Sequence, residues 1–274
     1  MPFRFSAFAI MGLLSTSLLL SACTKENGAD NKSDTLTATT PATGEASPLL
    51  ENNTKQRLIT TLQEQLKKAN INVKIVDIKT TEIPNIYWVN LEGMPSVYAT
   101  ADGKYLIQGD VLRLGGQQLE NVSDRLQATE NKKLFAALKT EDLIVYPASG
   151  KAKHVIYVFT DANCPYCHKL HEQLPEITAK GIEVRYIAWP RGEQFFPTME
   201  SIWCSTDRKA AFDRVVKGEQ LPSASCGSPV KSQYQLGINI GVNGTPAIYS
   251  EDGHYLGGYL SADEIAQRLE NNAK

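Results

Sequence analysis

The sequence lacks both a cluster of basic residues and a long apolar run. Its 28 lysine and arginine residues are balanced by 30 aspartate and glutamate residues, for a formal net charge of −2 at pH 7. Nucleic-acid binding requires a clustered positive surface. The apolar stretch from Ala7 to Leu20 is shorter than the roughly 20 residues that a spanning helix needs. We therefore expect no nucleic-acid partner and no transmembrane helix.

Cysteine is also scarce, and the first of the five cysteines lies near the amino terminus. Arg4, the apolar stretch and the small residues before Cys23 form the pattern of an export signal. Leu20-Ser-Ala-Cys23 resembles the bacterial lipobox, whose cysteine is lipidated and becomes the new first residue. We expect residues 1–23 to be a lipoprotein signal peptide; an ordinary cleaved signal with a chance cysteine is the alternative. Thr24 is not acidic, which favours the outer membrane.

The other four cysteines are an even number, as expected for an exported protein with two disulfide pairs. Four cysteines allow three connectivities. The close spacing of Cys164 and Cys167 selects one of these, which leaves Cys204 with Cys226. We interpret the second pair as a structural disulfide because neither cysteine has a close cysteine neighbour.

Cys164-Pro165-Tyr166-Cys167 lies between an apolar run, 155–159, and a stretch of helical periodicity that begins at His168. A thiol at a helix N-terminus faces unpaired N–H groups and the positive end of the helix dipole, which favour the thiolate. Pro165 suits the first helical position. Cys167, one turn further on, can attack a mixed disulfide formed by Cys164. The pattern predicts a redox-active dithiol.

Two other interpretations use the same residues. With His168 the motif is Cys-x-x-Cys-His, the pattern of covalent haem attachment. The β-branched and aromatic run before it argues against a cytochrome. Cys164, Cys167, His168 and His171 are all zinc-ligand types, but one helix face rarely surrounds a tetrahedral ion. We expect no cofactor and no metal.

The rest of the chain divides by composition into a flexible tether at 24–50, an α+β unit at 51–116, a solvated linker helix at 117–141 and a larger domain at 142–274. The α+β unit carries no cluster of catalytic residue types, and we expect a binding or oligomerisation module. In the larger domain, two extended runs at 143–147 and 154–159 suggest a hairpin. A β-α-β unit then ends near Ile187, and a helical insertion covers about 197–236.

Several motifs together resemble the DsbC/DsbG family of periplasmic thiol:disulfide interchange proteins, in the thioredoxin superfamily. They are Cys-Pro-Tyr-Cys-His-Lys-Leu-His-Glu at 164–172, Ile-Trp-Cys at 202–204 and Gly-Val-Asn-Gly-Thr-Pro at 241–246. The resemblance covers about residue 55 to the carboxyl terminus. The Pro-Tyr dipeptide is that of DsbG, whereas the Cys204 and Cys226 pair resembles DsbC.

The resemblance implies an α+β protein: a thioredoxin-like domain with a helical insertion, preceded by a cystatin-like dimerisation domain and a linker helix. It implies a periplasmic homodimer that acts on misfolded or misoxidised exported proteins and is kept reduced by a DsbD-like membrane reductant. It also implies that Pro246 is cis and that Thr245 and Pro246, with Pro165 and Tyr166, contact an extended substrate segment beside Cys164.

From these observations we expect a disulfide isomerase or reductase whose catalytic residues are Cys164 and Cys167. Three alternatives stay open: a DsbG-like reductase of sulfenylated cysteines, a net dithiol oxidase, and a holdase chaperone in which redox chemistry is secondary. A lipid anchor at Cys23 would be the chain's only link to a membrane.

Overall fold

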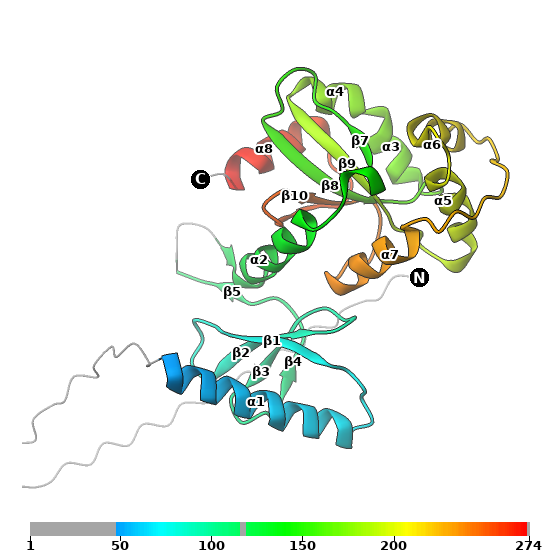
Figure 1. Ribbon diagram of the computed structural model, residues 1–274. Coiled ribbons are helices and arrows are strands. Elements are labelled where there is room, and N and C mark those ends of the chain that lie inside the picture. The colour runs from blue at the N-terminus through cyan, green and yellow to red at the C-terminus, as the bar shows by residue number, and fades with distance from the viewer. Residues whose placement is uncertain (1–47, 116–118, 273–274) are drawn as a thin grey trace, which may run out of the picture. The chain divides into compact units, whose positions relative to one another are not determined.

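The computed structural model describes residues 48–115 and 119–272 (Figure 1). The predicted signal peptide, the Cys23 lipidation site and residues 24–47 of the predicted tether lie outside the described residues. Helix α1, Pro48–Lys68, begins inside the predicted tether, so residues 48–50 are helical. None of the helices among the described residues combines the length and the apolar character that crossing a bilayer requires.

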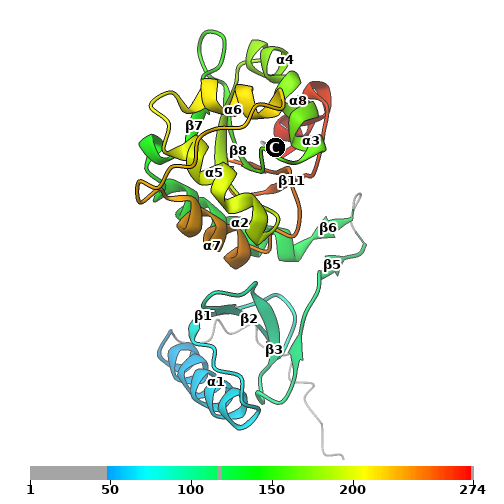
Figure 2. The same cartoon turned by 90° about the vertical axis from the view of Figure 1, so that its right-hand side faces the viewer.

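The amino-terminal unit is one helix packed on a four-stranded antiparallel sheet (Figure 2). Leu58, Leu62 and Leu66 recur at helical spacing on α1 and are buried against the sheet. The helix ends at Lys68, and Asn70, two residues later, turns the chain with a φ of 58°. The strands, in the spatial order β1-β2-β3-β4, are Ile75–Thr80, Ile86–Leu91, Val97–Thr100 and Leu106–Ile107.

Helix α2, Val122–Ala136, follows the short strands β5, Leu112–Arg113, and β6, Glu120–Asn121. The Asn121 side chain caps it by accepting a hydrogen bond from the Asp124 N–H. The expectation of a solvated helix was wrong for one face, because Phe135 is 1% exposed and stacks on Tyr157 with 4.5 Å between ring centroids. Most residues of α2 before Phe135 are polar, so the periodicity of the whole helix does not reveal this buried face.

The carboxy-terminal unit is built on a five-stranded sheet of order β11-β10-β8-β9-β7. Strand β8 is parallel to β9, and the other pairs are antiparallel. The expected hairpin of 143–147 with 154–159 was wrong: β7 pairs with β9, because β10 and β9 already occupy both edges of β8. The strands are Ile144–Tyr146 (β7), His154–Thr160 (β8), Ile182–Ala188 (β9), Ala247–Ser250 (β10) and Tyr255–Gly257 (β11).

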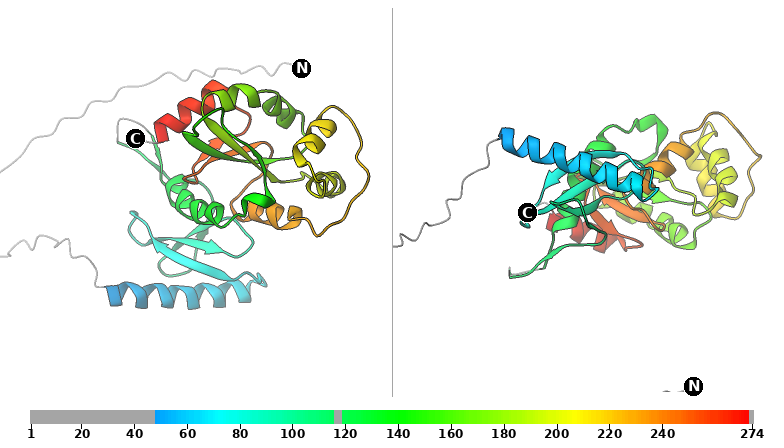
Figure 3. Two further views of the ribbon diagram at one scale, coloured as in Figure 1. Left: turned by 45° about the horizontal axis from the view of Figure 1, so that its top comes forward. Right: turned by 90° about the horizontal axis from the view of Figure 1, so that it is seen from below.

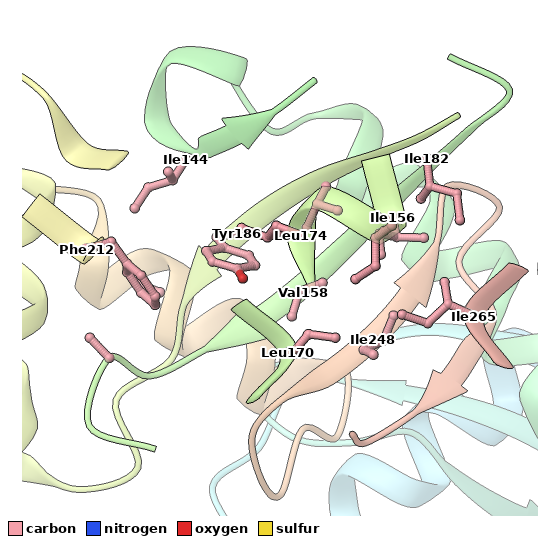
Figure 4. Close-up of a cluster of buried hydrophobic side chains, with 14 of the residues drawn as sticks. Ile144, Ile156, Val158, Leu170, Leu174, Ile182, Tyr186, Phe212, Ile248 and Ile265 are labelled. Carbon is pink, nitrogen blue, oxygen red and sulfur yellow. The ribbon is translucent and has the colours of Figure 1, made fainter. Parts of the chain in front are cut away.

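Helices cover both faces of this sheet, as the alternation of side chains along a strand requires (Figure 3). On β8, Ile156 and Val158 face the cluster formed with α3, α4 and α8. Tyr157 and Phe159 face the cluster formed with α2 and with α7, Val230–Asn239. Figure 4 shows the first cluster, in which Leu170 and Ile265 meet the sheet. Helices α3, α4 and α8 are Pro165–Glu172, Leu174–Ala179 and Ala262–Asn272.

The predicted helical insertion is three helices separated by turns. Helices α5, α6 and α7 are Phe196–Trp203, Arg208–Val216 and Val230–Asn239. A disulfide joins Cys204, at the end of α5, to Cys226 in the segment between α6 and α7. Helix α8 begins with a capping box: Glu264 Oε2 accepts from the Ser261 N–H, and the Ser261 hydroxyl accepts from the Glu264 N–H.

Candidate active site

The turn after β8 presents two free thiols at the start of α3. Cys164 is the N-cap residue, with extended backbone angles of φ −95° and ψ 121°, and Pro165 follows at the first helical position. Cys167 lies one turn into the helix. Both cysteines are free, and they are 2% and 1% exposed. The geometry brings a dithiol to a helix N-terminus and shields it from bulk water.

The pKa values of the two thiols are shifted in opposite directions. The pKa of Cys164 is lowered to about 5, chiefly because the Cys167 thiol donates a hydrogen bond to the thiolate, and also because Thr245 and backbone N–H groups stabilise it against the effect of burial. The pKa of Cys167 is raised, first by burial and then by its hydrogen bond to Cys164. At neutral pH Cys164 is therefore the thiolate nucleophile and Cys167 holds its proton.

The Thr245–Pro246 peptide is cis, as the resemblance implies, and lies beside Cys164. Cys164 Sγ lies 3.3 Å from the Thr245 carbonyl oxygen, which accepts a hydrogen bond from this sulfur only when the thiol is protonated. Pro246 immediately precedes β10, and the Tyr166 side chain is 55% exposed. The structure thus brings Pro165, Tyr166, Thr245 and Pro246 together around Cys164. Cys204 and Cys226 belong to the disulfide of the helical segment instead.

An ion pair that the sequence analysis missed holds the turn before Cys164. The Asp161 side chain is completely buried, and its carboxylate accepts hydrogen bonds from the Asn163 N–H at 2.8 Å and the Arg191 N–H at 3.1 Å. Arg191 Nε lies 3.0 Å from Asp161 Oδ2, and its Nη2 donates to the Asn163 carbonyl at 2.9 Å. Asp161 could have been singled out from the sequence, because it is a charged residue directly after the apolar strand β8. Arg191 gave no local signal.

The two histidines of α3 have partners other than a metal. His168 Nε2 lies 2.7 Å from the Ala162 carbonyl oxygen, and His171 Nε2 lies 2.8 Å from Asp213 Oδ1. Burial lowers the pKa of His171. Within residues 48–115 and 119–272, no group of three or more histidine, cysteine or acidic side chains is arranged to hold a metal ion.

Comparisons with known proteins divide the chain in the same way as the fold. Residues 140–273 match the family model described as a thioredoxin-like domain, and residues 38–124 match the disulfide bond isomerase protein N-terminal domain. The thiol:disulfide interchange protein DsbC of Dickeya dadantii is 44% identical over 64% of this chain and 72% of its own length. The Escherichia coli K12 protein of the same name is 38% identical over 75% of this chain and 86% of its own length.

A solved structure, a disulfide interchange protein from Neisseria gonorrhoeae, is 26% identical with a TM-score of 0.43. The match covers 50% of this chain and 99% of that one.

Proposed function

Because the chain belongs to the DsbC family of thiol:disulfide interchange proteins, we propose that it rearranges incorrect disulfides in exported proteins through Cys164 and Cys167. The observation that carries this proposal is the difference between the pKa values of the Cys164 and Cys167 thiols at the start of α3. A nucleophile with a pKa of about 5 is ionised at neutral pH, and a protonated neighbour is held one turn away.

The first step is the attack of the Cys164 thiolate on one sulfur of a substrate disulfide. A bond forms between Cys164 Sγ and that sulfur, the substrate S–S bond breaks, and the second substrate sulfur leaves as a thiolate. Thr245 and Pro246 lie next to Cys164 and would contact the chain that carries the attacked cysteine, in the manner of strand addition.

The mixed disulfide then has two fates. A different substrate thiolate can attack the substrate sulfur, which forms a new substrate disulfide and releases Cys164 as a thiolate with no net change of oxidation state. Alternatively, Cys167 loses its proton and attacks Cys164 Sγ, which releases the reduced substrate and leaves the Cys164–Cys167 disulfide. The second route needs two electrons from outside for each turnover, and we assign their supply to a DsbD-like membrane reductant.

We assign a structural role to the Cys204–Cys226 disulfide, which closes a loop with a sequence separation of 22 residues. In the chain-entropy description such a loop contributes about 3 kcal/mol to stability. The residues of this disulfide are absent from the hydrogen-bond network around Cys164 within the described chain.

A homodimer is supported by the edge of the amino-terminal sheet. Strand β4 is an edge strand, and Tyr105, Leu106 and Ile107 on and beside it are exposed. An exposed apolar edge is a template for pairing with another strand. We propose that the unit of residues 51–116 pairs with its counterpart in a second chain, with the segment at 117–141 leading to the catalytic domain at 142–274.

We further propose that the protein works in the periplasm, attached through a lipid on Cys23. The support is the sequence of residues 1–23 alone. The intact mass of the mature protein checks the anchor: a lipidated chain beginning at Cys23 is expected, and an unmodified chain that begins elsewhere would refute it.

The proposed activity is tested by refolding scrambled ribonuclease in a glutathione buffer with the wild-type protein, Cys164→Ala and Cys167→Ala. We expect recovery of ribonuclease activity to depend on Cys164 and to survive partly in Cys167→Ala, because a substrate thiol can resolve the mixed disulfide. No recovery from a folded, reduced wild-type protein would contradict the proposal. Reduction of a sulfenylated protein without such recovery would favour the DsbG-like alternative.

A further inference from the structure

When Cys167 resolves the mixed disulfide, its proton must move to another group. Cys167 is 1% exposed, and burial raises its pKa, so the thiol is protonated at neutral pH and closed to bulk water. The thiolate, and not the thiol, attacks the sulfur of a disulfide. A polar group behind Cys167 that takes this proton as the new S–S bond forms would therefore speed the step.

Two ionisable side chains beside the redox turn are already engaged. Both carboxylate oxygens of buried Asp161 accept hydrogen bonds, from the Asn163 N–H and from the N–H and guanidinium of Arg191. A carboxylate paired with a guanidinium keeps its charge, so it is a poor proton acceptor. His168 Nε2 lies 2.7 Å from the Ala162 carbonyl oxygen, which can only accept, so this nitrogen carries a hydrogen.

His171 lies one helical turn after Cys167 on α3. Residues four apart share one face of a helix, with about 5–6 Å between their Cβ atoms. The His171 side chain is 11% exposed. Its Nε2 lies 2.8 Å from Asp213 Oδ1 on α6, and its Nδ1 lies 3.3 Å from the Tyr186 hydroxyl on β9. The ring is thus fixed between the redox helix, the sheet and the helical segment.

These contacts assign the hydrogen of the neutral His171 ring. An ionised carboxylate only accepts hydrogen bonds, so Nε2 donates to Asp213 and Nδ1 accepts from the Tyr186 hydroxyl. Burial lowers the pKa of His171, so the ring is neutral at pH 7 and can accept a proton, and the resulting imidazolium is paired with Asp213. The titratable neighbours of the ring are Asp213 on α6, Tyr186 on β9, Tyr146 on β7, and His168 and Glu172 on α3.

The Tyr186 hydroxyl lies between this ring and the buried thiol. Tyr186 is completely buried in the apolar cluster that Leu170 of α3 also joins (Figure 4). Burial raises the pKa of Tyr186, and the charges of Tyr146, Cys167 and Asp213 raise it further. A hydroxyl that donates to Nδ1 keeps lone pairs that can accept from a second donor. Tyr186 can therefore take a proton on one side while it gives one up on the other.

We propose that His171 accepts the Cys167 proton through the Tyr186 hydroxyl when the mixed disulfide is resolved. The proton leaves Cys167 Sγ for the Tyr186 oxygen, and the Tyr186 hydroxyl proton passes to His171 Nδ1. The Cys167–Cys164 bond forms, and the bond from Cys164 to the substrate sulfur breaks and releases a substrate thiolate. Asp213 is 46% exposed, so the proton can then leave to solvent at this end. This inference rests on the proposed function, since the mixed disulfide is its starting point.

The test separates the two steps with the reduced full-length protein and the aromatic disulfide dithiobis-nitrobenzoate. Attack of Cys164 forms a mixed disulfide and releases one coloured nitrothiobenzoate thiolate, and attack of Cys167 then releases a second. Stopped-flow absorbance measures both rates across the pH range. Cys167→Ala identifies the phases, because it should show the first release and lack the second.

We expect His171→Gln and Asp213→Asn to slow the second release about tenfold or more at pH 7, as the loss of a proton acceptor implies, and to leave the first release unchanged. Tyr186→Phe removes only the hydroxyl and should have the same effect. In the wild type, the second rate should fall as the pH drops through the lowered pKa of His171, because a protonated ring cannot accept. This bend in the pH profile should be absent from His171→Gln, whereas a merely structural role for His171 would leave it in place.

His168→Gln is the matched control, because His168 lies on the same helix but contacts the Ala162 carbonyl oxygen instead of Tyr186 and Asp213. It should retain the second release and its bend. A second release unchanged in His171→Gln and Tyr186→Phe, or slowed equally in His168→Gln, would overturn the proton relay and leave the proposed activity standing. Absence of the first release from the folded, reduced wild-type protein would overturn the proposed activity itself.

Discussion

At the scale of single residues, the two thiols differ because their surroundings differ. Cys164 caps α3 and receives hydrogen bonds from Cys167, Thr245 and backbone N–H groups, whereas Cys167 is buried within the helix. Each hydrogen bond to the charged form lowers the pKa, and burial raises it. The reactivity of Cys164 is therefore a property of the turn and of the cis-proline segment that faces it.

Thr245→Val should raise the pKa of Cys164 by about one unit. The Thr245 hydroxyl is buried and has no hydrogen-bond partner within the described chain, so it is free to donate to the Cys164 thiolate, whose pKa it lowers. A hydrogen bond to a charged group contributes about 1.5–3 kcal/mol, and one pKa unit corresponds to about 1.4 kcal/mol. Titration of thiolate absorbance in the ultraviolet measures the change. An unchanged midpoint would show that Thr245 acts only through its backbone.

The sequence could predict the residues of the site that belong to local motifs. Cys164 and Pro165 are recognisable from the strand, the proline and the helix around them. Arg191 could not be found in this way, and neither could the hydrogen bond between Gln173 and Tyr259, because each contact joins residues that are distant in the sequence. Only the fold brings those pairs together.

At the scale of elements, α2 packs against the turn between β10 and β11 and is hydrogen-bonded to it. Asn131 is buried and donates to the Gly253 carbonyl at 2.9 Å, while Asp124 Oδ2 lies 2.7 Å from His254 Nδ1. The turn leads into Tyr255 at the start of β11, whose ring lies 5.2 Å from the ring of buried Tyr249 on β10. The helix that follows the amino-terminal unit thus contacts the strand pair that borders the substrate surface.

Gly253→Ala should destabilise the protein by about 3 kcal/mol or more. A Cβ there would lie 2.2 Å from the Ala128 carbonyl oxygen and 2.7 Å from the Lys132 nitrogen, both backbone atoms, and φ is +89°. Overpacking costs about 1–3 kcal/mol, and a left-handed conformation costs a further 1–2 kcal/mol. Denaturant unfolding measures the change.

The matched control is Gly218→Ala, which has the same φ of +89° but no atom within 4 Å of the added Cβ. Its free energy of unfolding should fall only by the cost of the left-handed backbone conformation, about 1–2 kcal/mol. Equal losses in the two variants would show that α2 does not pack closely on the turn.

The His254 contact should also depend on pH. Its hydrogen bond with Asp124 and the charges of Asp124 and Asp252 raise the pKa of His254 above 6.5. Its contribution to stability is therefore complete below about pH 6.5, and it is lost as the pH rises through the raised folded-state value. Unfolding across this window, compared with His254→Gln, checks the sign. Parallel pH profiles for the two proteins would contradict it.

The elements themselves were mostly predictable from periodicity and turn residues. The extended runs at 143–147 and 154–159 contain β7 and β8, and the β-α-β unit expected to end near Ile187 ends with β9 at Ala188. The partner of β7 was not, because sequence proximity favours a hairpin, and the competing pairings of β8 with β9 and β10 are set by the whole sheet.

At the scale of the whole molecule, we expect two chains to associate through the edge strand β4 of the amino-terminal sheet. The wild-type protein should sediment at twice the mass of one chain, and Leu106→Asp with Ile107→Asp should sediment as a monomer, since both side chains are exposed on this edge. Val76→Asp is the control, because Val76 is exposed on β1 at the opposite edge and should leave the dimer intact. A monomeric wild-type protein in analytical ultracentrifugation would contradict the assignment.

The measurement that tests the account most directly is the pH dependence of alkylation of the reduced protein, with the labelled cysteine identified by mass spectrometry. Labelling should occur at Cys164 with a midpoint near pH 5, while Cys167 should stay unlabelled until the protein unfolds. A midpoint near pH 9, or labelling of Cys167 first, would show that the fold does not create a thiolate at Cys164 and would remove the basis for the proposed chemistry.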